Sequence, residues 1–138
     1  MWFYYALLSA LFAAFTAVFA KIGVSNINFN LATVIRTVII LVLVWSIVFI
    51  NGEAKQIGSL SKMNILFLVL SGVATGLSWL FYFKALQIGK VSQVAAVDKL
   101  SVAIAIILSV LFFKETVTLK TVIGALLIIS GTILFALK

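Results

Sequence analysis

Residues 76–113 read GLSWLFYFKALQIGKVSQVAAVDKLSVAIAIILSVLFF, and this stretch decides the fold. It contains the end of one long apolar run and the whole of another, and only the short polar step QIGK separates them. A run of about 20 predominantly apolar residues is long enough to cross a bilayer as an α-helix. Because the step is so short, we expect two transmembrane helices that are antiparallel neighbours.

The same pattern extends outward over the rest of the chain. The predicted spans are residues 2–20, 31–50, 63–86, 91–113 and 119–137. No Lys or Arg precedes the first run, as a cleavable signal peptide would require, so we interpret this run as a retained span. The spans use nearly all of the sequence, which predicts a single transmembrane domain, residues 1–138, in an all-α integral membrane protein.

Composition supports this class. Hydrophobic residues make up 65% of the chain, charged residues 9%, and the mean hydropathy is +1.36. A soluble globular protein has roughly 45–50% apolar and about 25% charged residues, because its exterior faces water. The exterior of this protein must therefore face lipid. We predict a multi-pass protein of the cell membrane.

The residue types that carry most enzyme chemistry are missing. There is no Cys and no His, and the carboxylates are Glu53, Asp98 and Glu115. This inventory lacks thiol and imidazole nucleophiles and the commonest transition-metal ligands. We therefore expect no enzyme, no metal site and no cofactor. The net charge of +7 does not indicate nucleic-acid binding, because the basic residues are scattered between apolar spans.

Proline is also absent, so no helix is expected to bend through a missing backbone donor. Flexing is then expected at glycine or small-residue sites, the candidates being Gly72, Gly76, Gly124 and Gly131.

Five charged residues lie within or at the ends of the predicted spans. With a rise of about 1.5 Å per residue, they all fall in the same half of the membrane. They are Lys21, Arg36, Lys84, Asp98 and Lys99. Charges at such depth are costly and mark functional sites by default. Because adjacent helix positions do not face each other, we expect Asp98 to pair with Arg36 or Lys84 and not with Lys99.

Two interpretations of these charges stay open. In one, they form an ion-pair network that holds helices together, with lysines extending to the interface. In the other, the positive group forms a vestibule suited to a carboxylate or phosphate on a passing solute. The second interpretation predicts a substrate path of Arg36, Lys84, Asp98 and Lys99, with an amphipathic wall of Trp79, Tyr82 and Tyr5. The alternative for these aromatic residues is anchoring at the lipid or the interface.

The loop charges bear on orientation, because positive charge in short loops normally marks the cytoplasmic side. One side has Lys55, Lys62, Lys114 and Lys120, and the other has Lys21, Lys84, Lys90 and Lys138. This balance predicts a chain that inserts in both orientations and forms an antiparallel homodimer. If Arg36 and Lys99 count as loop charge, one orientation is fixed instead.

Small residues in the last span suggest where two copies meet. Gly124 and Gly131 lie seven positions apart on one helix face within GALLIISG. Small residues let helices approach closely in lipid, so this face is a candidate dimer seam. Ordinary packing within one chain is the alternative.

Several motifs resemble the EamA-type domain of the drug/metabolite transporter superfamily in its short five-span form. They are YFKAL in the third span, FKE after the fourth, IGALLIISGTIL in the fifth and, more loosely, FAKIGV and the Arg of ATVIRTVIIL. The resemblance covers nearly the whole chain. It implies one five-helix repeat that pairs with a second of opposite orientation around a solute path, with the fifth helix peripheral.

GALLIISG is similar to the dimerising segment of the related small multidrug resistance proteins. Those proteins rely on a glutamate in the first helix, and this chain has no carboxylate there. Many EamA-type domains also have proline near the start of the fourth helix, where this chain has VDKLS.

The resulting hypothesis is a transporter that exports a small metabolite such as an amino acid, by alternating access across a homodimer. The expected partners are a carboxylate-bearing solute and the lipid bilayer, with no nucleic acid. The alternative is a non-transporting or lipid-translocating subunit that assembles with another membrane protein.

Overall fold

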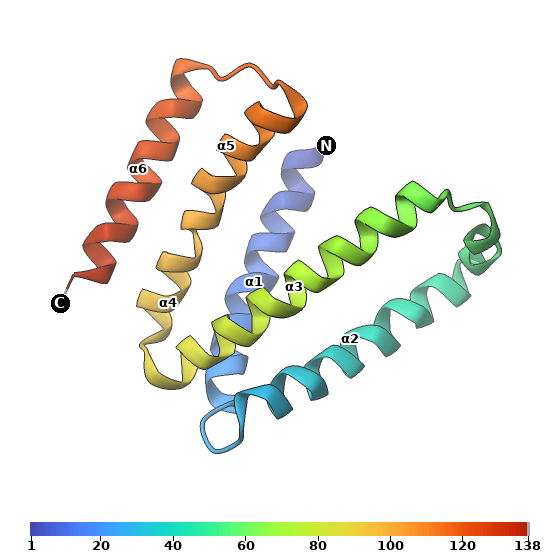
Figure 1. Ribbon diagram of the computed structural model, residues 1–138. Helices are drawn as coiled ribbons and strands as arrows, with labels where there is room; N and C mark the ends of the chain where they lie inside the picture. The colour runs from blue at the N-terminus through green and yellow to red at the C-terminus, as the bar shows by residue number, and fades with distance from the viewer. Residues whose placement is uncertain (138) are drawn as a thin grey trace. The chain divides into compact units, whose positions relative to one another are not determined.

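A computed structural model describes residues 1–137, and Lys138, counted above among the loop charges, lies outside them. Over the described residues the chain forms helices and connections without a strand (Figure 1). Five helical segments are long and apolar enough to cross a membrane. The predicted all-α, five-span membrane protein is therefore confirmed.

The first three spans are slightly longer than the apolar runs that predicted them, the fourth has the predicted bounds, and the fifth ends one residue earlier. The helices are α1 (Trp2–Gly23), α2 (Phe29–Ile50), α3 (Lys62–Ile88), α4 (Val91–Asp98), α5 (Leu100–Phe113) and α6 (Leu119–Ala136), and the short 3₁₀ helix η1 (Glu53–Ser59) joins α2 to α3. Polar caps explain two of the starts. The Asn28 side chain accepts a hydrogen bond from the Asn30 N–H at 2.8 Å, and the Thr118 hydroxyl accepts one from the Thr121 N–H at 3.2 Å.

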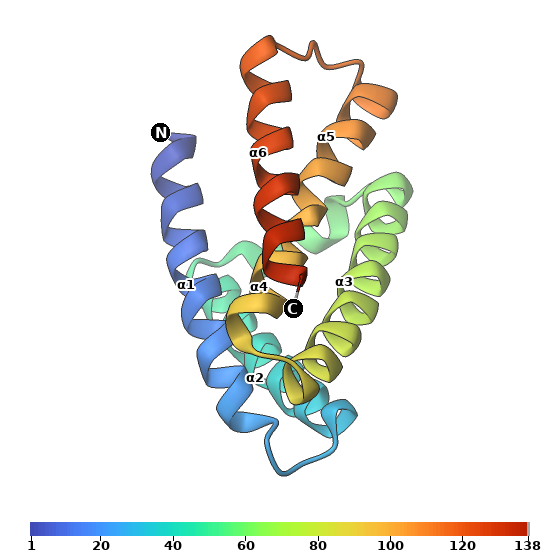
Figure 2. The same cartoon turned by 90° about the vertical axis from the view of Figure 1, so that its left-hand side faces the viewer.

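The described chain divides into two compact parts, residues 20–87 and residues 1–19 with 88–137. In the first part, α2 and α3 run antiparallel and η1 connects them at one end (Figure 1). In the second part, α4 and α5 both contact α6. Figure 2 shows α5 and α6 lying side by side, joined by the extended connection after Phe113.

A reciprocal set of hydrogen bonds ties the connection between α1 and α2 to the end of α3. The Lys21 ammonium donates to the backbone carbonyl of Leu86, and to that of Gln87 at 3.4 Å. In return, the Gln87 amide donates to the carbonyls of Val24 at 2.9 Å and Ile27 at 2.6 Å. These bonds satisfy carbonyls that helix ends and loops leave without a backbone partner. Val24 and Leu86 are among the most buried side chains of the described residues.

The fourth span is interrupted. α4 ends at Asp98, α5 begins at Leu100, and Lys99 lies between them with φ −70° and ψ −9°. The Lys99 N–H donates to the Ala96 carbonyl at 3.1 Å, which is the three-residue spacing of a 3₁₀ turn. The glycines named as flexing candidates lie in the third and fifth spans, so this break has a position that the sequence analysis did not predict.

The tie at Gln87 yields the first test. Replacing Gln87 with Leu keeps a similar side-chain volume but removes the two hydrogen bonds to the backbone carbonyls of Val24 and Ile27. At about 0.5–1.5 kcal/mol per bond, we expect the free energy of unfolding to fall by about 1–3 kcal/mol. Reversible unfolding in mixed detergent micelles measures this change.

Gln56→Leu is the matched control, because Gln56 is an exposed residue of η1. Exposed substitutions of this kind usually change stability by less than about 0.5 kcal/mol. Equal effects of the two substitutions would contradict the role assigned to Gln87.

Candidate functional site

The most informative charged group within a span is Arg36 on α2. Its guanidinium carbon lies 4.0 Å from the ring centroid of Trp79 and 5.3 Å from that of Phe83. Trp79 and Phe83 are four positions apart on α3 and so lie on one helix face. Phe83 is buried and Arg36 is half-buried. A cation held over aromatic rings and partly removed from solvent gains about 1–2 kcal/mol.

A second cation repeats this arrangement in the opposite direction. The ammonium of Lys84, on α3, lies 5.8 Å from the ring centroid of Phe29, at the start of α2. Each of the two helices thus presents a cation to an aromatic ring of the other. Lys84 is exposed, so this contact is the weaker of the two.

Arg36 has no acidic partner within its own part of the molecule. The carboxylate that the sequence places in residues 20–87 is Glu53, which lies in η1 beyond the far end of α2. Within residues 20–87, no ion pair joins a carboxylate to Arg36 or Lys84. Stacking occupies the face of the guanidinium, and its N–H donors point along its edge. The edge is therefore the part of Arg36 that suits an anionic group.

An open groove of about 470 Å³ lies on the same turns of α2. It is lined by Asn30, Thr33, Val34, Thr37, Val38, Gly76 and Leu80. The Thr33 hydroxyl donates to the Phe29 carbonyl and the Thr37 hydroxyl to the Thr33 carbonyl, both at 2.8 Å. Since these hydroxyl protons are committed to the backbone, the groove offers a solute a largely apolar wall. Its size falls within the roughly 300–1,000 Å³ range of small-molecule sites.

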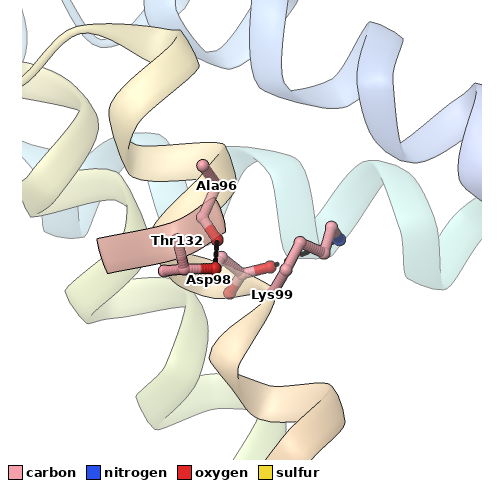
Figure 3. A network of polar contacts seen from close by, with 4 residues as sticks. All are labelled: Ala96, Asp98, Lys99 and Thr132. Carbon is pink, nitrogen blue, oxygen red and sulfur yellow. Dashed lines mark hydrogen bonds and ion pairs between the residues drawn. The ribbon is translucent and has the colours of Figure 1, made fainter. Parts of the chain in front are cut away.

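Asp98 and Lys99 lie at the interruption between α4 and α5. Their side chains form an ion pair at 3.6 Å, and both are exposed (Figure 3). The expectation that these neighbours would not pair is wrong. It assumed a regular helix, in which adjacent side chains point about 100° apart, whereas the backbone departs from that geometry at this point.

The structure brings together part of the predicted substrate path. Arg36, Trp79 and Lys84 lie on α2 and α3, as does Tyr82, which is half-buried. Tyr5 is 72% exposed on α1. Gly124 and Gly131 lie on α6, and a Cβ atom added at either would meet no other atom within 4 Å. Packing within the chain therefore does not require glycine at these two positions.

Sequence reasoning missed several residues of this region. Phe83 contacts Arg36 together with Trp79, and Phe29 contacts Lys84. The four-residue spacing between Trp79 and Phe83 was a usable signal for Phe83. A polar stripe at positions 30, 33 and 37 was a usable signal for the groove. Gln87 had no such signal, because its bonds reach residues about 60 positions away.

The stacking of Arg36 on Trp79 is measurable by a double-mutant cycle. We expect Arg36→Leu and Trp79→Leu to be non-additive by about 0.5–2 kcal/mol in the free energy of unfolding, because each removes the same contact. Reversible unfolding in mixed micelles provides the four values.

Trp45 supplies the control cycle, since it lies farther along α2 and stacks on Phe49, with a centroid distance of 5.2 Å. Arg36→Leu and Trp45→Leu should be additive within about 0.5 kcal/mol. Additivity in both cycles would show that the guanidinium gains nothing from Trp79.

Comparisons with known proteins agree with this membrane architecture. The profile of the EamA-like transporter family matches residues 1–137. A Sinorhizobium protein named as an uncharacterized transporter is 47% identical over 135 residues, covering 98% of this chain and 96% of its own. An uncharacterized protein of Methanocaldococcus jannaschii is 36% identical over 84 residues, or 61% of each chain. No solved structure matches significantly. The chain therefore belongs to the EamA-like transporter family and is a multi-pass membrane transporter.

Proposed function

We propose that this transporter exports a small carboxylate-bearing metabolite, such as an amino acid, and that Arg36 binds the carboxylate. The observation that carries the proposal is the half-buried guanidinium stacked on Trp79, with no carboxylate paired to it within residues 20–87. A charge held in a span without an acidic partner is costly, and an anionic solute offsets that cost.

The chemistry of the guanidinium favours a carboxylate over a point anion. Its planar fork of donors matches two carboxylate oxygens, and contact with the Trp79 and Phe83 rings helps to hold the guanidinium in place. Lys84 adds a second positive charge near the start of α2. The apolar groove on α2 suits the hydrocarbon part of the same solute.

The proposed path also includes Asp98 and Lys99, which are charged residues about two turns into the fourth span. Charged residues within spans commonly mark solute or ion pathways. Tyr82 and Tyr5 offer the amphipathic surfaces expected of a path wall.

Alternating access in this proposal uses two copies in opposite orientations. The balance of loop charges and the open face at Gly124 and Gly131 support an antiparallel homodimer with α6 at the seam. Open space at both glycines leaves the α6 backbone accessible to a second helix.

The alternative proposal is a lipid-translocating or non-transporting subunit of a larger membrane assembly. The open apolar groove near a cation also suits an acyl chain and a headgroup phosphate. Measuring both leucine transport and flipping of a fluorescent phospholipid in liposomes separates the two proposals.

Transport by purified protein in liposomes tests the role of Arg36. Arg36→Gln removes the charge, and loss of a charge-assisted hydrogen bond costs about 1.5–3 kcal/mol, so we expect the apparent affinity for leucine to fall about 10- to 100-fold. Arg36→Lys should give an intermediate value, because a point charge replaces a planar fork.

Lys62→Gln is the matched control, since Lys62 is exposed at the start of α3. Leucinol, which lacks the carboxylate, should be a poor competitor for leucine. Flipping of a fluorescent phospholipid without leucine transport would favour the lipid-translocating alternative. Equal leucine transport by Arg36→Gln and the unaltered protein would eliminate the carboxylate role.

Orientation tests the dimer independently. Because the chain has no Cys, single cysteines at Ser25 and Ser59 have no competing thiols. We expect an impermeant maleimide to label each site from both faces of the membrane, as a chain inserted in two orientations requires. Labelling of each site from one face only would exclude self-pairing in opposite orientations and point to a second protein as the partner.

A further inference from the structure

The interruption of the fourth span is not at a glycine or a proline. Residues 91–113 contain neither Gly nor Pro, yet the helix breaks at Lys99. Sharp bends in helices occur at proline, at glycine or serine pairs, and also where a side chain enters the backbone hydrogen-bond ladder. At this break, a side chain of another helix bonds a backbone carbonyl of the ladder.

The side chain that enters the ladder belongs to Thr132 on α6. Its hydroxyl donates to the Ala96 carbonyl at 3.2 Å, and Figure 3 shows it beside the end of α4. The same carbonyl accepts from the Lys99 N–H at 3.1 Å. In a regular α-helix this carbonyl would accept from the N–H four positions ahead. The Thr132 hydroxyl thus supports the carbonyl at the point where the ladder changes.

The bond made by Thr132 differs from those of the other span hydroxyls. Ser46, Thr75 and Ser130 donate to carbonyls of their own helices, four positions back. Thr132 instead reaches a different helix and is only 4% exposed. A buried hydroxyl and a helix carbonyl that bond each other in lipid both avoid the cost of an unsatisfied polar group.

The interruption also makes the Asp98–Lys99 pair possible. Side chains at adjacent positions of a regular helix do not face each other. At this break, the Lys99 ammonium and the Asp98 carboxylate are 3.6 Å apart. The ion pair thus lies at the point where the span departs from regular helical geometry.

From this juxtaposition we propose that Thr132 is a positioning residue that holds the fourth span in its interrupted form and thereby keeps Asp98 paired with Lys99. The span then has two arrangements. In one it is broken, capped by Thr132 and ion-paired, and in the other it is continuous and unpaired. This role concerns the shape of the span and does not depend on which solute the protein carries.

Distances between spin labels in liposomes test the proposal on the full chain. Labels on cysteines at Ser92 and Leu111, both exposed, lie on either side of the break. In a continuous helix, their Cα atoms would be about 28 Å apart, at about 1.5 Å per residue. We expect Thr132→Val to move the distance distribution toward that value, changing the ratio of the two arrangements roughly three- to tenfold.

Two variants show whether the hydroxyl itself is responsible. Thr132→Ser keeps a hydroxyl and should restore the original distribution. Ser130→Ala removes a hydroxyl that bonds its own helix and should leave the distribution unchanged. An unchanged distribution in Thr132→Val would overturn the proposal, as would a shift that Thr132→Ser fails to reverse.

Asp98→Asn tests the link to the ion pair and remains informative if Thr132→Val does not fold. Removing the charge should shift the distribution in the same direction as Thr132→Val, and the double variant should shift by less than the sum. If Asp98→Asn leaves the distance unchanged, the pair is not linked to the break and the proposal is wrong.

Discussion

The constraint on which the rest of this structure depends is that backbone polar groups in lipid must find partners within the protein. It accounts for the helical spans, because an α-helix satisfies its own backbone. It also explains why the exceptions coincide with specific polar side chains. Where the chain leaves helical geometry after α1, the Gln87 amide bonds the carbonyls of Val24 and Ile27, and at the end of α3 the Lys21 ammonium bonds the carbonyl of Leu86. Where the fourth span breaks, Thr132 bonds Ala96.

The charges of α2 and α3 follow a related rule, with aromatic rings in the place of carboxylates. Arg36 rests on Trp79 and Phe83, and Lys84 lies over Phe29. A ring face stabilises a cation without neutralising it, so the positive charge stays available to an anion. Within residues 20–87 the cations of α2 and α3 therefore contact rings and not carboxylates. This feature is the one on which the proposed transport of a carboxylate-bearing solute rests.

Much of the fold was predictable because the length of an apolar run can be read directly along the sequence. Each span appears as a run of about 20 apolar residues, and the five runs correspond to the five spanning segments. The ends were less predictable, since a cap such as Asn28 lets α2 begin two residues before the predicted apolar run. Of the site, Arg36, Trp79 and Lys84 were identifiable as polar or amphipathic residues inside apolar runs. Phe29, the aromatic partner of Lys84, and the hydrogen bonds of Gln87 were not identifiable, because these contacts join residues more than 50 positions apart.

By itself, the sequence determined the membrane class, the number of spans and the residues whose charge is out of place in lipid. Those properties follow from composition and local order, which no packing arrangement can alter. Only the tertiary structure decided where the fourth span breaks and which groups the charged residues contact. The reason is that Thr132 lies 36 positions from Ala96, and Arg36 lies on a different helix from Trp79. Such pairings depend on how helices are placed in three dimensions, and a pattern read along the chain does not contain that information.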